Sequence, residues 1–173
     1  MVQSVELLLD AATDAVVRGQ WALLAAFGLP SQARHAGSFN APHVTVAVRG
    51  SIDLAGESAL SAAADGLPLP IRLGALCCFG RRRFVLVRLV VGDVRLLELH
   101  ARVAAALGPD PDDPEAIGNL SPGRWTPHVT LAHRLSAEQV ATALTVLDGS
   151  IECASTAVSC RRWDGDAKQA WPV

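Results

Sequence analysis

The sequence predicts an α+β fold made of two similar halves, related by a pseudo-twofold axis and facing each other across a central cleft. Two observations support this prediction. Each half alternates strand-like and helix-like segments in the same order, β-α-β-α-β. Each half also carries Pro-His-Val-Thr at the same place in that order, as "APHVTVAV" (41–48) and "TPHVTLAH" (126–133). A matching motif at a matching position indicates an internal duplication.

The first half begins with a buried strand at 4–9 and a helix at 10–28, for which Asp10 is the expected N-cap. Gly28 and Pro30 end this helix. The apolar residues at helical spacing along it are Val16, Leu23, Leu24 and Phe27. The motif strand at 43–48, a helix at 53–66 and a strand within 69–80 complete the half.

The second half repeats this order. Strands are expected at 83–91, 128–133 and 152–163, helices at 93–108 and 136–149, and a polar loop at 109–125. Ser136 and Gln139 have the spacing of a capping box. The motif histidine precedes the closing Gly of the next helix by 23 residues in the first half (43 to 66) and by 21 in the second (128 to 149).

The 173 residues are expected to form a single domain, because half of them are hydrophobic and can build one core. Its approximate lobes are 1–80 and 81–173, and a terminal strand of one lobe can exchange into the other. The net charge of −2 argues against a protein that clamps long nucleic acid through many phosphates. A small anion or one nucleic-acid end remains compatible with it.

The four cysteines, at 77, 78, 153 and 160, contain no CxxC pair. We interpret them as reduced core residues and not as a zinc site or a disulfide framework. The N-terminus lacks the basic flank of a signal peptide, and no apolar run approaches the length of a membrane span. These features predict a soluble, cytoplasmic protein that does not bind membranes.

The motif strands carry the residues that point to chemistry. Side chains alternate along a strand, so His43 and Thr45 share one face, and His128 and Thr130 share one face of theirs. A pseudo-twofold would therefore bring two imidazoles and two hydroxyls together across the cleft. One imidazole can take a proton while the other gives one, and hydroxyls can donate to phosphate oxygens. This equipment suits attack on a phosphodiester and requires no metal.

The segments "HVTV" (43–46) and "HVTL" (128–131) resemble the two HxTx motifs of the 2H phosphoesterase superfamily. The chain is most similar to the bacterial branch described as 2′-5′ RNA ligase-like or RNA 2′,3′-cyclic phosphodiesterase, and the resemblance covers nearly its whole length. It implies that His43 and His128 are the catalytic pair and that Thr45 and Thr130 bind phosphate. His43 would act as base and His128 as acid in hydrolysis of a 2′,3′-cyclic phosphate, without a cofactor.

The implied partner is a small nucleotide or an RNA end with a cyclic phosphate or a 2′-5′ linkage, bound by a monomer, since one cleft per chain suffices. Relatives often carry Arg five residues after the second motif histidine, where this chain has His133 followed by Arg134. This departure leaves the exact substrate open, and ligase activity is the weakest implication. The alternative function is a module that binds a nucleotide or RNA terminus without turnover.

Asn40 and Trp125 lie close to the motif strands and have two interpretations each. Asn40 can contact a ligand or serve a turn, and Trp125 can stack on a nucleobase or close the core. His100 is expected to be structural, and the loop residue His35 to be solvated. His133 should point away from His128 on an ideal strand. That alternation disfavours a four-histidine metal site built from His35, His43, His128 and His133. Arg81, Arg82 and Arg83, near Arg161 and Arg162, form a solvated hairpin tip or attract an RNA end.

Overall fold

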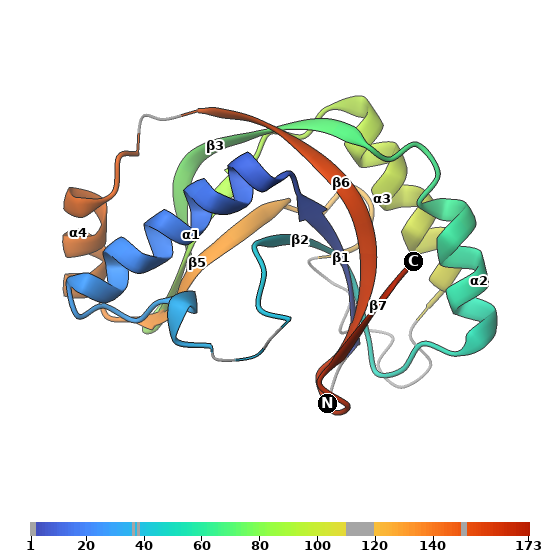
Figure 1. Ribbon diagram of the computed structural model, residues 1–173, viewed down its shortest axis with the longest axis horizontal. Coiled ribbons are helices and arrows are strands. Elements are labelled where there is room, and N and C mark those ends of the chain that lie inside the picture. The colour runs from blue at the N-terminus through green and yellow to red at the C-terminus, as the bar shows by residue number, and fades with distance from the viewer. Residues whose placement is uncertain (1–2, 36, 38, 110–119, 150–151) are drawn as a thin grey trace.

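The computed structural model describes residues 3–35, 37, 39–109, 120–149 and 152–173 (Figure 1). Apart from two short elements at 32–34 and 169–172, the strands and helices follow one another along the chain in the order predicted from the sequence. They are β1 (Gln3–Leu9), α1 (Ala11–Ala26), the 3-10 helix η1 (Gln32–Arg34), β2 (His43–Arg49), α2 (Leu54–Ala63), β3 (Leu69–Gly80), β4 (Phe84–Val90), α3 (Val94–Leu107), β5 (His128–Leu135), α4 (Ala137–Val146), β6 (Cys153–Asp164) and β7 (Gln169–Pro172).

The strands form one antiparallel sheet that closes into a ring. Their order is β1-β2-β5-β4-β3-β6-β7, and β6 also pairs with β1. The ring can close because β3 and β6, with 12 residues each, are long enough to pair with two neighbours. They pair with each other over 69–73 and 153–157. Beyond that stretch, β3 pairs with β4 and β6 pairs with β1.

Each half therefore gives its terminal strand to the other half. The strand β3 follows the first motif but pairs with β4, and β6 follows the second motif but pairs with β1. The two motif strands meet on the opposite side of the ring. Their one recorded register pair within the described residues is Val44 with Val129.

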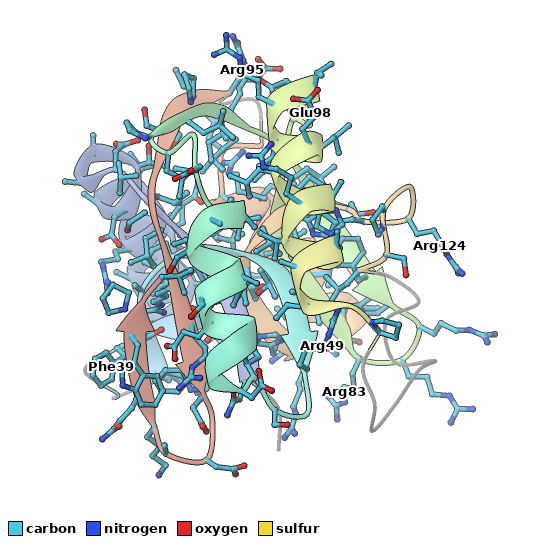
Figure 2. The ribbon with its side chains drawn as sticks, turned by 90° about the vertical axis from the view of Figure 1, so that its right-hand side faces the viewer. Phe39, Arg49, Arg83, Arg95, Glu98 and Arg124 are labelled. Carbon is cyan, nitrogen blue, oxygen red and sulfur yellow. The ribbon has the colours of Figure 1, made fainter. Side chains whose placement is uncertain are left out.

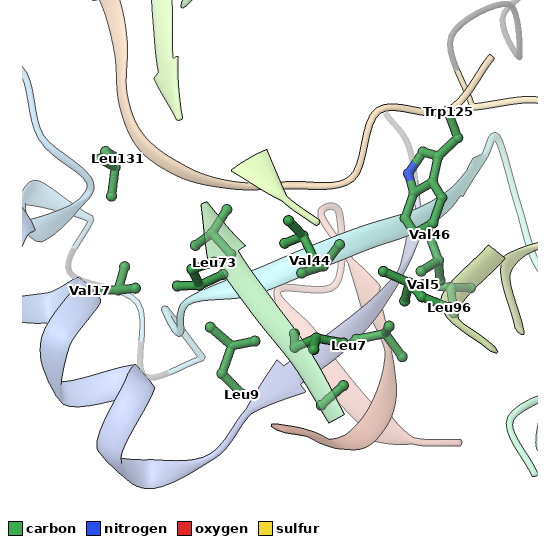
Figure 3. Close-up of a cluster of buried hydrophobic side chains, with 14 of the residues drawn as sticks. Val5, Leu7, Leu9, Val17, Val44, Val46, Leu73, Leu96, Trp125 and Leu131 are labelled. Atoms are coloured by element: carbon green, nitrogen blue, oxygen red, sulfur yellow. The ribbon is translucent and has the colours of Figure 1, made fainter. Parts of the chain in front are cut away.

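The helices cover the ring in two pairs. In Figure 1, α1 and α4 lie together at the left and α2 and α3 lie together at the right, and each pair is in contact. The helix α1 packs on β5, and α3 packs on β2, so each motif strand is covered by a helix of the other half. Figure 3 shows the core that results, where Val17 of α1 and Leu96 of α3 point toward the strands. Both side chains are fully buried.

The predicted α+β fold with duplicated halves is confirmed, as are the N-caps. The side chain of Asp10 accepts a hydrogen bond from the Thr13 amide, and Ser136 and Gln139 form the capping box. The buried face of α1 differs from the prediction. Leu24 is buried as expected, but Val16, Leu23 and Phe27 are exposed, and the residues buried beside Leu24 are Thr13, Val17 and Trp21.

Two short elements, the helix η1 and the strand β7, were not expected from the sequence. Most of the predicted loop 109–125 lies outside the described residues. None of the described helices is long and apolar enough to cross a membrane.

All four cysteines are free thiols. Cys160 is buried, which raises its pKa to about 12 and keeps the thiol protonated, while the other three are only partly buried.

Candidate active site

The strands β2 and β5 place the four motif side chains on one face. Val44 and Val129 pair in antiparallel register and are fully buried. His43, Thr45, His128 and Thr130 alternate with them and point to the opposite face, where all four are half-buried. This register sets His43 across from Thr130 and Thr45 across from His128. The two histidines are then diagonal neighbours, for which the usual spacing of about 7–8 Å leaves room for a phosphate between them.

Both motif histidines are held by the same backbone contact. Nδ1 of His43 lies 2.8 Å from the carbonyl oxygen of Ala41, and Nδ1 of His128 lies 2.7 Å from that of Thr126. A carbonyl oxygen only accepts hydrogen bonds, so Nδ1 must carry a proton in each ring. Nε2 is therefore the nitrogen that can take up or release a proton in both histidines.

A tryptophan supports each motif strand from the other half of the chain. Trp21 in α1 donates through Nε1 to the carbonyl oxygen of Thr130 at 3.0 Å. Trp125 donates to the carbonyl oxygen of Thr45 at 3.1 Å. The two hydrogen bonds repeat the pseudo-twofold and fix the backbone of the residue that carries each motif hydroxyl.

Trp125 lies in the core, which agrees with one of its two interpretations and not with stacking on a nucleobase. Its side chain is buried, and its ring stacks on His100 with centroids 4.1 Å apart and planes 5° from parallel. His100 is buried as well, and its Nε2 contacts the carbonyl oxygen of Leu120 at 2.8 Å. Burial lowers the pKa of His100, and this hydrogen bond offsets part of the shift.

A buried ion pair lies under the first motif. Glu6 on β1 pairs in register with Thr45 and with Arg161 of β6. Its Oε2 accepts from Nε and Nη2 of Arg161, at 2.8 Å and 2.7 Å, and its Oε1 accepts from the Ser4 hydroxyl at 2.7 Å. That same Oε1 lies 3.5 Å from Nε2 of His43. One motif histidine therefore has a carboxylate beside its free nitrogen.

The second motif has apolar residues at the corresponding positions. Val87 pairs with Thr130 and with Cys77, as Glu6 pairs with Thr45 and Arg161. The ring of Phe79 meets that of His128 edge to face, with centroids 5.0 Å apart. The site is thus polar around His43 and apolar around His128. Sequence reasoning missed Glu6, although a single carboxylate within the apolar run 4–9 was a signal for it.

A β-bulge in β5 changes where His133 points. Val87 pairs with Thr130, Leu86 with Ala132 and Phe84 with Leu135, so β5 has one extra residue at each of two successive register shifts. Arg134, in the second of them, has a left-handed backbone with φ 60°. Alternation is broken there, and His133 and Arg134 are both exposed. The prediction that His133 faces away from the motif histidines is therefore wrong.

A cavity of about 1210 Å³, here called the His43 cavity, adjoins the motif face. His43, His35 and His133 line it together, and Asn40 also lies in its wall. Partial desolvation in this cavity lowers the pKa of His133, and electrostatic interactions with His35, Arg134, His128 and His43 add to the effect. The Asn40 amide donates to the carbonyl oxygens of Gln32 and His35, at 2.9 Å and 3.0 Å, so it organises the loop. His128, Thr45 and Thr130 lie outside the lining of this cavity.

No group of three His, Cys, Asp or Glu side chains in the described part of the chain is arranged to hold a metal ion. The four-histidine set considered from the sequence is no exception, although the bulge brings His133 toward the other three. The described side chains that surround the motif histidines offer hydroxyls and one buried carboxylate besides the imidazoles.

A family model identifies the family of this chain, and solved structures resemble its fold. The family model described as the 2′-5′ RNA ligase superfamily matches residues 36–167. A solved phosphoesterase structure has a TM-score of 0.56 at 16% identity, covering 99% of this chain and 95% of that one. A protein of Thermus thermophilus gives 0.56 at 16%, covering 100% and 94%. Escherichia coli LigT with 3′-AMP gives 0.51 at 17%, covering 99% and 92%. No curated protein matches the sequence significantly.

Proposed function

Because the chain belongs to the 2′-5′ RNA ligase superfamily, we propose that it is a metal-independent phosphodiesterase in which His43 and His128 act as general base and general acid. The substrate is a 2′,3′-cyclic phosphate or a 2′-5′-linked nucleotide, free or at an RNA end. The proposal takes the protein to act as a cytoplasmic monomer, since one chain supplies both histidines. Ligation is not part of it.

The observation that carries this proposal is the matched anchoring of the two histidines. Both rings are held through Nδ1 by a carbonyl oxygen two residues earlier, which leaves both Nε2 atoms for proton transfer. A binding module would need neither the matched anchoring nor the second imidazole. General acid–base catalysis by one such group contributes a factor of about 10²–10⁴.

The reaction follows from these roles. Nε2 of His43 takes a proton from water while the water oxygen forms a bond to phosphorus. The bond from phosphorus to the 3′ oxygen breaks, and Nε2–H of His128 gives its proton to that oxygen. The product is a 2′-phosphate. Thr45 and Thr130 donate hydrogen bonds to the phosphate oxygens.

Glu6 supports the assignment of His43 as the base. When Nε2 of His43 gains the proton of water, the imidazolium carries a positive charge that the carboxylate at 3.5 Å stabilises. Arg161 holds that carboxylate in place. The ligand class is supported by the related structures, because LigT of E. coli has been crystallised with 3′-AMP and with ATP.

The test is hydrolysis of nucleoside 2′,3′-cyclic phosphates, and of a short RNA with a 2′,3′-cyclic end, in the presence of EDTA. Wild type is compared with His43→Gln and His128→Gln, whose folding is checked by circular dichroism. We expect a 2′-phosphate product and a loss of kcat of at least about 10²-fold in each variant. Turnover that survives in either folded variant would refute the paired mechanism. Nucleotide binding without any turnover would favour the binding module.

A further inference from the structure

Unpaired cations gather on the His43 cavity. No ion pair within the described residues involves Arg34, Arg83, Arg134 or Lys168, and all four line this cavity. Glu6, which also lines it, is already neutralised by Arg161. The cavity therefore has a net positive charge beside His43, although the whole chain has a net charge of −2.

The bulge in β5 builds part of this charged wall. Arg134 has φ 60°, a conformation that an L-residue other than Gly adopts at a cost and that often marks a functional position. The bulge turns Arg134 and His133 into the cavity that His43 also lines, although regular alternation would separate them. Arg83, just before β4, lines the same cavity.

The cavity also offers an aromatic surface. Phe39 and Trp163 line it with ring centroids 6.0 Å apart and planes at 50°. Rings of this kind provide a stacking surface for a nucleobase. The volume of about 1210 Å³ is larger than the roughly 300–1,000 Å³ of a typical small-molecule site, so it exceeds what one cyclic phosphate needs.

We propose that the His43 cavity binds a second phosphate of the substrate through Arg134 and Arg83, so that the preferred substrate carries another phosphate besides the one that reacts. This inference rests on the proposed function, since it takes the reacting phosphate to lie between His43 and His128. The second phosphate is that on the 5′ oxygen of the terminal nucleoside. It can be a 5′-monophosphate or the internal diester of a short RNA end.

Equilibrium binding tests this without requiring turnover. Isothermal titration calorimetry compares adenosine 2′-monophosphate with adenosine 2′,5′-bisphosphate, and with an adenosine dinucleotide that ends in a 2′-phosphate. Arg134→Asn and Arg83→Gln each remove one charge, and Asn tolerates the left-handed backbone at position 134. Arg95→Gln is the matched control, because Arg95 is exposed and unpaired within the described residues and lies at the far end of the molecule from Arg83 (Figure 2).

We expect wild type and Arg95→Gln to bind a ligand with two phosphates about tenfold more tightly than the monophosphate, as one charge-assisted contact predicts. The preference should fall to about threefold or less in Arg134→Asn and Arg83→Gln. Comparing the affinity for the bisphosphate with that for the dinucleotide shows whether the cavity prefers a 5′-monophosphate or an internal diester. Equal affinity for one and two phosphates in wild type, or a preference that both variants retain, would overturn the inference.

The hydrolysis assay separates this inference from the proposed function. If the arginine variants lose the two-phosphate preference but wild type shows no turnover, the second-phosphate site is supported and the phosphodiesterase activity is refuted. If turnover depends on both motif histidines but wild type shows no two-phosphate preference, the activity is supported and the second-phosphate site is refuted.

Discussion

At the scale of single residues, the two motifs differ most in what lies beneath them. Glu6 and Arg161 form an ion pair of which only 4% and 10% of the side chains are exposed, where the second motif has Val87 and Cys77. Burying two charges costs free energy, so such a pair is poor at stabilising a fold compared with apolar residues. Its position beside Nε2 of His43 gives it a use that stability alone does not.

The ion pair leads to a prediction about stability. Arg161→Met leaves the carboxylate of Glu6 buried without its main partner, which should lower the free energy of unfolding by about 3–5 kcal/mol. The double variant Glu6→Gln with Arg161→Met removes the charge as well and should recover part of the loss. Urea unfolding of wild type and the variants measures both. A single variant as stable as wild type would show that the pair is not buried as described.

At the scale of elements, each motif strand depends on an indole from the other half. Trp21→Phe and Trp125→Phe keep an aromatic ring but leave the carbonyl oxygen of Thr130 or Thr45 without its donor. Each should lower the free energy of unfolding by about 1–3 kcal/mol, the cost of leaving an acceptor in a partly buried position without this donor. Urea unfolding of each variant measures the loss. Leu24→Met on the same buried face of α1 is the control, where only packing changes and a smaller loss is expected. Losses no larger than that of the control would contradict the prediction.

Most elements could be predicted from the sequence, and the failures have physical causes. Of the four residues predicted to form the apolar face of the first helix, only Leu24 is buried. The buried face contains Thr13 and Trp21, whose polar atoms bond to Asp10 and to the carbonyl oxygen of Thr130. The partner of Trp21 lies 109 residues away in the sequence, so a local pattern cannot reveal it. The bulge was missed because no glycine marks the left-handed position, which Arg134 occupies.

The residues of the candidate site were also predicted only in part. His43, Thr45, His128 and Thr130 could be placed on one face because strand alternation is local and the motif repeats. Glu6 could not be assigned to the site, because strand pairing brings it there from a distant segment. Phe39 and Arg134 are near the motifs in sequence, but only the folded chain shows that they line the cavity beside His43. Trp125 lies three residues before His128 in the sequence, but the fold buries its side chain in the core.

At the scale of the whole molecule, two histidines make stability depend on pH. Burial lowers the pKa of His100 from its usual 6.5, and partial desolvation in the His43 cavity lowers the pKa of the more exposed His133. In the unfolded chain these groups bind protons near pH 6.5, while the folded chain does so only at lower pH. The unfolded state then binds more protons, so stability is full above about pH 6.5 and falls as the pH drops below it.

The urea midpoint should therefore be lower at pH 5.5 than at pH 7.5, and His100→Gln should reduce the difference, since Gln does not titrate in this range. Burial alone would raise the pKa of Asp10, but hydrogen bonds from the Thr13 and Thr156 amides lower it. Asp10 therefore changes the stability of the fold only at about pH 3.8 and below, outside the range of this comparison. A difference that His100→Gln leaves unchanged would assign the effect to other groups.

The exchange of β3 and β6 has a consequence for the origin of the chain. A polypeptide of half this length could not complete its own sheet, because its last strand pairs with the first strand of the other half. Two copies of such an ancestor could build the ring only as a homodimer with swapped strands, and neither copy alone would hold two histidines. Gene fusion would then have tied the dimer into one polypeptide and freed each copy to diverge. The different surroundings of His43 and His128 are the divergence that a symmetric dimer could not have had.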